Sequence, residues 1–407
     1  MANVSSSNGI EKYPKLRFPE FTEPWSHIKL SDFTERVMRK NKNNETNLPL
    51  TISSKDGLVD QVTFFNKTVA SKDMSGYYLL KKGEYAYNKS YSVGYDFGSI
   101  KRLERYPMGA LSTLYICFAL TKYNSDYIKT YFDSLKWYKE IYMISAEGAR
   151  NHGLLNVPTD EFFSTFHYIT EDLKEQEKIA KLMQLIELRI QKQQALVDNL
   201  KKYKRGVINK LINEISLEGT QCNFAELVTI QRGGSPRPID DYITDESDGI
   251  NWIKIGDVGA DSLYITKTKE RIKSSGAKKS RKVYPDDLIL SNSMSFGRPY
   301  IMKIDGCIHD GWLLIRDKNE FFDKKFLCYY LASDNVLSQY RRFAAGSCVS
   351  NLNSELVGNL QIVLPSMEQQ NKCASIFEKI DSCVLNAVKQ YEHLCQIKKG
   401  LQQQLFI

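Results

Sequence analysis

The chain of 407 residues is too long for one ordinary core, so we expect two or three domains. A composition of 42% hydrophobic and 26% charged residues excludes an extensively disordered chain. No apolar run is long enough to cross a membrane, and the polar start MANVSSSNG lacks a signal-peptide core, so we expect a cytoplasmic protein with no membrane partner. The net charge of +8 is compatible with a polyanionic partner but does not establish one.

Four segments follow one another along the chain. Residues 1–170 and 218–365 contain short apolar runs such as LYICFAL, NWIKIGDV and PYIMKI, separated by Gly, Asn, Asp and Pro. This pattern is typical of strands and turns and predicts two globular mixed α/β domains. Residues 171–217 and 366–407 instead carry helical periodicity, and each predicts one long helix.

The second half of the chain repeats the first. The stretch DEFFSTFHYITEDLKEQEKIAKLMQLIE from Asp160 aligns with SELVGNLQIVLPSMEQQNKCASIFEKID from Ser354, a shift of 354 − 160 = 194 residues that then holds to the chain end without a gap. Gln176 matches Gln370 in this register. A period of this length indicates duplicated domains rather than a solenoid.

Both predicted helices carry an apolar stripe with the 3.5-residue spacing of a coiled-coil seam. Alternating steps of four and three from Ile179 meet eight apolar residues in ten, and the same steps from Cys373 meet nine in ten. Lys204 and Lys398 interrupt the two stripes at equivalent positions of the repeat. Leu182, Leu185 and Leu196 lie beside the first stripe and widen it. We expect the helices to pack through Ile179, Met183, Ile186, Ile190, Val197, Leu200, Phe377, Ile380, Val384, Tyr391 and Leu394. The simpler alternative is that each helix covers only its own domain.

Gly206 and Gly400 interrupt the two helices at matching positions, each just after a basic pair. A glycine inside a helix costs roughly 1 kcal/mol relative to alanine, so each could mark a helix end. The apolar steps continue beyond both glycines, which leaves a continuous or kinked helix open as well. Our hypothesis is that each glycine permits close approach to the neighbouring domain, with the lysines facing a partner subunit or phosphate.

A helix of about 36 residues is roughly 54 Å long, so two antiparallel helices would hold two domains far apart. We therefore expect an α+β fold in which two globular domains are separated by two long antiparallel spacer helices, related by a pseudo-two-fold internal repeat. Duplicated domains at a fixed spacing suit a partner with two binding sites, and duplex DNA is such a partner.

Four stretches closely resemble specificity subunits of type I restriction-modification systems: YPKLRFPEFTEPW, LVTIQRGGSPRP with NWIKIGDV, VYPDDLILSNSMSFGRPYI, and LPSMEQQNKCASIFEKID with IKKGLQQQLF. The resemblance covers nearly the whole chain, but the first repeat lacks the Leu-Pro-Ser that precedes the second helix. It implies a non-catalytic subunit whose two target-recognition domains read a bipartite, asymmetric double-stranded DNA target. It also implies two methyltransferase (modification) subunits that use S-adenosylmethionine and two ATP-dependent restriction-translocase subunits.

The residues predict no catalytic centre, cofactor or metal site in this chain. It contains no Pro-Pro pair for an Asn-Pro-Pro-Tyr methyltransferase loop and no GxxxxGK[ST] motif. Pro285-Asp286 and the downstream Asp323-Lys324-Lys325 superficially resemble a nuclease motif, but the first is better explained as a turn entering the strand LILS. The five histidines lack metal-ligand spacing, and the eight cysteines, without CxxC, are expected to be reduced.

Base edges and phosphates are contacted mainly by Arg, Lys, Asn and Gln side chains in loops. In the second domain we expect DNA contacts from Arg232 and Arg237 in RGGSPRP, whose glycines permit close approach to phosphate, from Lys278 and Lys279 in a basic run, and from Asn292, Ser293 and Arg298. The resemblance supports Asn292 and Arg298. Gly233 and Gly234 could instead only make a turn, and the basic run could be a solvated loop. In the first domain the loosely aligned candidates are Asn88, Lys89, Tyr91, Lys101 and Arg102.

The alternative function is a protein-interaction scaffold with two duplicated binding domains and an incidental positive charge. The two functions differ in their response to salt, because a protein that neutralises phosphates releases counterions and loses affinity steeply as salt rises.

Overall fold

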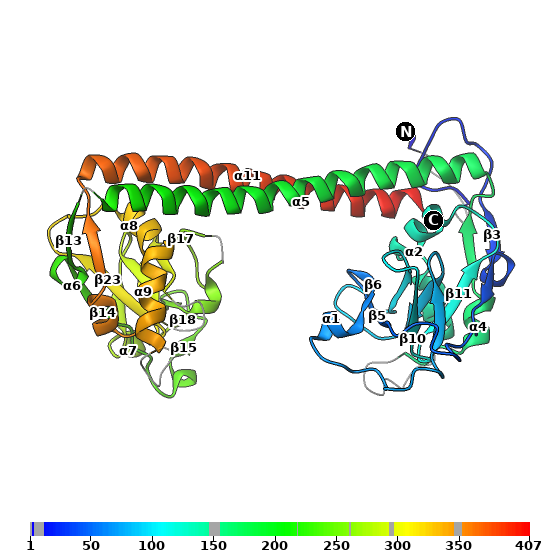
Figure 1. Cartoon of the computed structure of the whole chain (residues 1–407), viewed down its shortest axis with the longest axis horizontal. Helices are drawn as coiled ribbons and strands as arrows, with labels where there is room; N and C mark the ends of the chain where they lie inside the picture. Colours follow the sequence, from blue (N-terminus) through cyan, green and yellow to red (C-terminus); the bar gives the residue numbers. More distant parts are fainter. Residues whose placement is uncertain are drawn as a thin grey trace. The chain divides into compact units, whose positions relative to one another are not determined.

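The computed structural model describes residues 2–3, 12–145, 155–217, 219–259, 262–292, 297–345 and 352–407. The chain divides into two compact units. Unit 1 consists of Met1–Gln193 with Gln390–Ile407, and unit 2 consists of Gln194–Lys389. Each long helix therefore contributes one part to each unit (Figure 1). None of the described helices combines the length and the apolar character needed to cross a membrane.

Unit 1 contains two four-stranded sheets with the strand orders β6-β5-β10-β7 and β4-β11-β8-β9. Neighbouring strands are antiparallel, except that β5 and β10 are parallel. Strands β12 and β3 form a two-stranded sheet, as do β1 and β2. The strands are β1 (Ala2–Asn3), β2 (Leu16–Arg17), β3 (Ser26–Lys29), β4 (Thr34–Arg36), β5 (Pro49–Ser53), β6 (Gly57–Asp60), β7 (Tyr78–Lys81), β8 (Tyr85–Asn88), β9 (Ser99–Arg102), β10 (Met108–Leu111), β11 (Ile116–Leu120) and β12 (Phe166–Ile169). The helices are η1 (Leu30–Asp32), α1 (Gln61–Phe65), α2 (Ser125–Asp133), α3 (Tyr138–Ile144) and α4 (Thr159–Ser164).

The core of unit 1 is largely aromatic, and it includes the last residues of the chain. Leu405, Phe406 and Ile407 are buried in the same apolar cluster as Trp25 and Tyr127. The ring of Phe406 lies 6.1 Å from that of Trp25 and 5.5 Å from that of Tyr127. Because aromatic rings bury large apolar areas, these contacts fasten the end of the chain to residues near its start.

Unit 2 contains two five-stranded sheets with the orders β14-β23-β20-β21-β17 and β15-β18-β16-β22-β19. The pairs β16–β22 and β17–β21 are parallel, and β13 pairs with β24 in a separate antiparallel sheet. The strands are β13 (Thr220–Asn223), β14 (Val228–Arg232), β15 (Ile243–Thr244), β16 (Ile250–Ile253), β17 (Tyr264–Ile265), β18 (Glu270–Ile272), β19 (Arg281–Val283), β20 (Leu288–Ser291), β21 (Pro299–Met302), β22 (Gly306–Ile308), β23 (Trp312–Asp317) and β24 (Gln361–Leu364). The helices are α6 (Phe224–Leu227), η3 (Ile239–Asp241), η4 (Ile255–Asp257), α7 (Ser274–Ala277), α8 (Lys324–Leu331), α9 (Asp334–Ala345) and α10 (Ser354–Gly358).

The two long helices are α5 (Leu173–Ser216) and α11 (Met367–Leu405). Both continue through their glycine, so neither Gly206 nor Gly400 marks a helix end. Both glycines are exposed, and a Cβ atom added to either would meet nothing within 4 Å. Within this chain, our hypothesis that they permit close approach to a neighbouring domain is therefore wrong.

The residues expected to pack the helices are all buried or half-buried. In unit 1, Glu187 on α5 pairs with Lys398 on α11, with 2.7 Å between Oε1 and Nζ, and the Nε2 atom of Gln193 lies 3.3 Å from the Oε1 atom of Gln390. Residue numbers thus rise along one helix as they fall along the other, so these segments are antiparallel. Leu185 and Leu196 are exposed, so these two residues do not widen the buried stripe as expected.

The two lysines that interrupt the apolar stripes each have an acidic partner on the other helix. In unit 1 Lys398 pairs with Glu187, and in unit 2 Lys204 pairs with Asp381. The pairs are equivalent in the repeat register, since 187 + 194 = 381 and 204 + 194 = 398. A charged pair within an apolar seam favours one register and one helix direction, because a shifted alignment would leave the charges unpaired.

The first turns of the two helices explain why the first repeat lacks Leu-Pro-Ser. Ser366 and Gln369 cap α11 reciprocally: the Ser366 amide donates to Gln369 Oε1 at 3.0 Å, and the Gln369 amide donates to Ser366 Oγ at 3.3 Å. At the start of α5 the cap is Asp172, whose Oδ1 accepts from the Lys174 amide at 2.8 Å. Glu175, which aligns with Gln369, instead binds Arg17. The first repeat thus uses this position to hold the N-terminal segment.

Candidate nucleic-acid interface

Two other segments of unit 2, one at the end of β14 and one after β20, converge on Asp310, which follows β22. Its Oδ1 atom accepts a hydrogen bond from Ser235 Oγ at 2.8 Å, and its Oδ2 atom lies 3.4 Å from a terminal nitrogen of Arg237. Its main-chain oxygen accepts from Arg232 Nε at 3.1 Å and from Asn292 Nδ2 at 2.9 Å. Three of the predicted DNA contacts, Arg232, Arg237 and Asn292, thus meet at one acidic residue that the sequence did not indicate.

The two glycines of RGGSPRP allow this convergence. A Cβ atom on Gly233 would lie 2.1 Å from the main-chain oxygen of His309, so no larger residue fits at that position. The Gly233 amide donates to Trp312 O at 2.9 Å, and the Gly234 amide donates to Ile308 O at 3.1 Å. Both amides are therefore used within the chain. The expectation that these glycines approach a phosphate is wrong for this structure, because they approach the chain's own backbone.

In the cluster around Asp310, the aspartate is ionised and its partner Arg237 is largely exposed to solvent. Burial alone would raise the pKa of Asp310, but the hydrogen bond from Ser235 and nearby positive charge outweigh it and hold that pKa below its usual value. Asp310 is therefore ionised at neutral pH. The side chain of Arg237 is 82% exposed, and its ion pair with Asp310 leaves most of its N–H groups free.

The other candidates of unit 2 differ in what they can contact. Asn292 is only 3% exposed and its amide is bonded to Asp310, so it supports the loop and does not face a base as expected. Lys278 and Lys279 are exposed, and Lys279 Nζ lies 2.5 Å from Tyr242 Oη. The Arg298 guanidinium lies over the ring of Tyr300, 5.7 Å from its centroid. Ser293 lies outside the described residues.

In unit 1 the candidates fall into two separate groups. Asn88 is the last residue of β8, and Lys89 and Tyr91 lie in the connection that follows it, where Asn88 Oδ1 accepts from the Ser90 amide at 3.0 Å. Tyr91 is exposed, whereas Lys89 is half-buried and burial lowers its pKa. Lys101 and Arg102 lie at the far end of β9, where Arg102 pairs with Tyr85 rather than with Asn88.

Lys101 and Arg102 are mostly buried and form ion pairs within unit 1. Lys101 Nζ is 2.6 Å from Asp133 Oδ1, and Arg102 is 2.6 Å from Asp126 Oδ1; both acids belong to α2. Arg102 also pairs with Glu104 at 2.7 Å. Acids brought close by folding already neutralise these two residues, and DNA contact by them stays a prediction.

Unit 1 also exposes an aromatic pair that the sequence did not single out. Phe64 and Phe65, in α1, are both exposed and their ring centroids are 5.0 Å apart. Val62 and Val69 are exposed in the same stretch. Adjacent aromatic residues usually indicate a core, so the exposure of Phe64 and Phe65 becomes evident only in the folded structure.

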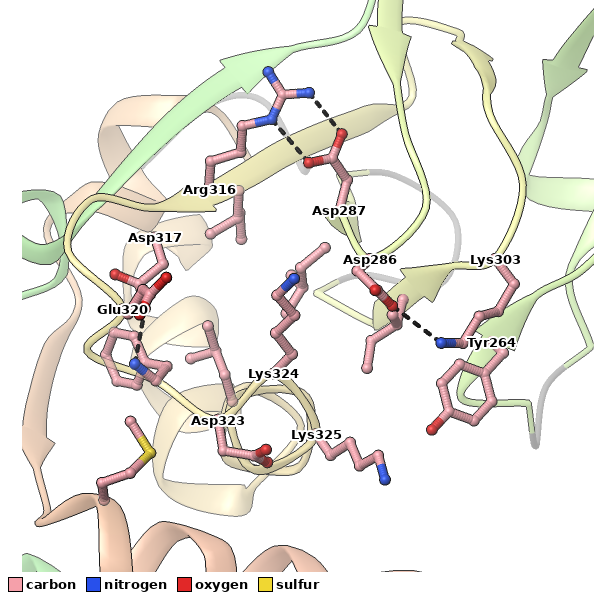
Figure 2. Close-up of a pocket in the computed structure, with 16 residues that line it drawn as sticks. Tyr264, Asp286, Asp287, Lys303, Arg316, Asp317, Glu320, Asp323, Lys324 and Lys325 are labelled. Carbon is pink, nitrogen blue, oxygen red and sulfur yellow. Dashed lines mark hydrogen bonds and ion pairs between the residues drawn. The ribbon is translucent and has the colours of Figure 1, made fainter.

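A charged cavity of about 680 Å³ in unit 2 brings together the residues that superficially resemble a nuclease motif (Figure 2). Asp286 Oδ1 is 3.0 Å from Lys303 Nζ, and Asp287 forms a two-bond pair with Arg316. Asp323 caps α8 by accepting from the Phe326 amide at 2.7 Å. Asp286, Asp287 and Asp323 therefore each have a structural partner. Among the described residues no group of three or more His, Cys, Asp or Glu side chains is placed to hold a metal ion.

Comparisons with known proteins show what the chain is similar to. Residues 223–396 match the family described as the type I restriction modification DNA specificity domain. Over 262 residues the chain is 24% identical to the type I restriction enzyme MjaVIII specificity subunit of Methanocaldococcus jannaschii. That match covers 56% of this chain and 58% of the relative, so it spans little more than half of either protein.

Two solved structures share the fold. One, reported under the description of complex assembly and conformational transition of the type I R-M system, has a TM-score of 0.60 and 15% identity, covering 94% of this chain and 97% of the other. The type I restriction-modification S subunit from M. genitalium has a TM-score of 0.51 and 15% identity, covering 97% and 99%. The family match and the curated relative confirm that the chain resembles type I specificity subunits.

Proposed function

We propose that this chain is the DNA-binding specificity subunit of a type I restriction-modification complex. It reads a bipartite, asymmetric target and positions methyltransferase and restriction-translocase subunits on it, without itself catalysing a reaction. The observation that carries the proposal is that the DNA specificity domain at 223–396 contains the whole Asp310 cluster, with its outward-pointing arginine. S-adenosylmethionine and ATP would then be bound by the partner subunits.

Two half-sites are proposed because the units repeat one another in detail. The Glu187–Lys398 and Asp381–Lys204 pairs occupy equivalent positions. Gln176 Oε1 accepts from the Asn124 amide at 2.7 Å, and the equivalent Gln370 Oε1 accepts from the Asp323 amide at 2.9 Å. Asn124 and Asp323 are the N-caps of α2 and α8, the helices that lie against the two spacers. These matches support duplicated target-recognition domains at 1–170 and 218–365, with spacer helices at 171–217 and 366–407.

Docking of the methyltransferase subunits on the long helices is supported by a surface that occurs in both units. Tyr203 precedes Gly206 by three residues, and the equivalent Ile397 precedes Gly400 by three, which places each pair on one helix face. All four residues are exposed. Leucine at both glycine positions should therefore impair assembly with the methyltransferase, whereas alanine should not. Unchanged assembly of the leucine variant would remove these positions from the docking surface.

The proposal is tested by mapping methylated adenines in the DNA of cells that express the chain with its methyltransferase subunit. We expect a split motif with two different halves separated by a gap of fixed length. Absence of such a motif would contradict the proposal. The scaffold alternative predicts duplex binding that is insensitive to salt, whereas a subunit that neutralises Z phosphates should show a log-log slope near −0.9Z.

A further inference from the structure

We propose that Arg237 reads a guanine in the half-site bound by unit 2, and that Asp310 is the positioning residue that aims it. This inference rests on the proposed function and names one base contact within it. It assigns a role to Asp310, which no sequence motif indicated.

The geometry leaves Arg237 free to make a paired contact. A guanidinium group has five N–H donors, and the one approach to Asp310, at 3.4 Å, occupies a single terminal nitrogen. The side chain is 82% exposed, so the remaining donors face solvent. Two parallel N–H groups match the O6 and N7 acceptors of guanine in the major groove. Adenine presents a donor beside N7, and arginine cannot accept from it.

Asp310 is itself held rigidly, which it must be to orient another side chain. Ser235 Oγ donates to its carboxylate at 2.8 Å, and two side chains from different loops donate to its main-chain oxygen. The segment that carries Arg237 is fixed as well, because the Gly233 and Gly234 amides bond to Trp312 O and Ile308 O. The main-chain segments that carry Arg237 and Asp310 are therefore each held by separate hydrogen bonds.

The charge of Asp310 favours a base over a phosphate as the ligand. A phosphate brought to Arg237 would also approach the Asp310 carboxylate, and like charges repel. The neutral edge of a guanine carries no such penalty and still accepts two hydrogen bonds. An arginine paired with an acid is consequently a poorer non-specific anion site and a better base reader.

The test maps methylated adenines in cells that express the methyltransferase subunit with the wild-type chain, Arg237→Gln or Asp310→Asn. One half of the wild-type motif should contain an invariant guanine. Arg237→Gln should reduce the preference for guanine at that position by about 10- to 100-fold, the range of one bidentate contact. Asp310→Asn keeps an oxygen for Ser235 but loses the charge, and should relax the same position. The other half-site should be unchanged in both variants, which also shows that they fold.

Arg271→Gln is the matched control, since Arg271 is an exposed arginine of unit 2 whose side chain bonds to the main-chain oxygens of Glu246 and Ser247. It should leave the motif unaltered. Uniform loss of methylation at all sequences in Arg237→Gln would make Arg237 a phosphate contact and overturn the inference. Unchanged base preference in Asp310→Asn would overturn the positioning role. A wild-type chain without a split motif would instead refute the proposed function.

Discussion

At the residue scale, the ion pair between Arg17 and Glu175 is almost completely buried, which is costly unless both charges are well paired. The two carboxylate oxygens of Glu175 accept from Arg17 Nε at 2.7 Å and from a terminal Arg17 nitrogen at 2.8 Å. Thr170 Oγ1 and Trp25 Nε1 donate to the same carboxylate at 2.6 and 3.3 Å. Arg17 is 5% exposed and Glu175 is fully buried. This network joins the N-terminal segment to the first turn of α5.

Glu175→Gln should therefore destabilise unit 1 by about 3–5 kcal/mol, because it leaves the buried charge of Arg17 without a counter-ion. Urea denaturation of the full chain, followed by hydrogen exchange of unit 1 peptides, measures the change. Glu177→Gln, at an exposed position on the same turn, is the control and should shift stability by less than about 0.5 kcal/mol. Equal effects of the two substitutions would show that the ion pair contributes little.

His167 makes the stability of unit 1 depend on pH. Its ring lies between Tyr131 Oη and Thr165 Oγ1, each at 2.8 Å, and burial lowers its pKa from 6.5 to about 3. Below pH 6.5 the unfolded chain binds a proton that the folded chain does not, so stability falls as pH drops from 6.5 towards 3. The loss between pH 7 and pH 5 should be about 2 kcal/mol from this residue.

The measurement compares unfolding at pH 7 and pH 5 for the wild-type chain and His167→Gln. The variant is less stable at pH 7, but it should lose about 2 kcal/mol less on acidification. His393→Gln, at an exposed position on α11, should retain the wild-type pH dependence. If His167→Gln lost as much stability between pH 7 and pH 5 as the wild-type chain, the pH dependence would have to come from other groups.

At the scale of the elements, both long helices tolerate a glycine that their packing does not require. Gly206 and Gly400 lie inside α5 and α11, are exposed, and have open space where a Cβ atom would be. The helices persist because their apolar stripes are buried on both sides of each glycine. In unit 2 Ile208 and Ile212 are buried beyond Gly206, and in unit 1 Leu405 is buried beyond Gly400.

Alanine at either glycine should raise the free energy of unfolding of the corresponding unit by roughly 1 kcal/mol, the difference in helix propensity. The stability gain of the double variant should equal the sum of the two single gains, because the two sites belong to different units and share no contacts. Thermal unfolding of the single and double variants measures the gain. A loss of stability in the alanine variants would mean that the helices bend or open at these positions.

At the scale of the whole molecule, the proposal that α5 and α11 act as spacers predicts how the target should change with their length. Inserting seven residues after Gln193 and seven after Lys389 lengthens both helices where the units divide. Seven residues are close to two turns, so the apolar seam stays in register. The added length is about 10.5 Å, or roughly three base pairs of duplex.

Methylation mapping should then show the same two half-sites with a gap about three base pairs longer. Insertion into α5 alone should abolish modification, because the Glu187–Lys398 and Lys204–Asp381 pairs on either side of the insertion can no longer form together while α11 keeps its length. An unchanged gap in the double insertion would show that the helices do not set the spacing.

The long helices follow from the sequence, because helical periodicity depends on short-range order along the chain. The 3.5-residue stripe and the shift of 194 residues predict α5 and α11 to within a few residues of their ends. The repeat register also shows that Lys204 and Lys398 interrupt the two apolar stripes at equivalent positions. It does not show that Asp381 and Glu187 are their ion-pair partners.

Which polar side chains face outward depends on residues brought together from distant parts of the chain. Lys101 and Arg102 look like Arg232 and Arg237 in the sequence, but α2 supplies acids to the first pair, whereas Asp310 leaves Arg237 exposed. Asn292, selected for its residue type, is buried by its contact with the same acid. Charge pairing and burial are set by contacts between residues that are tens of positions apart, so local sequence patterns do not show them. Only the tertiary structure distinguishes an exposed arginine from one held in a structural ion pair.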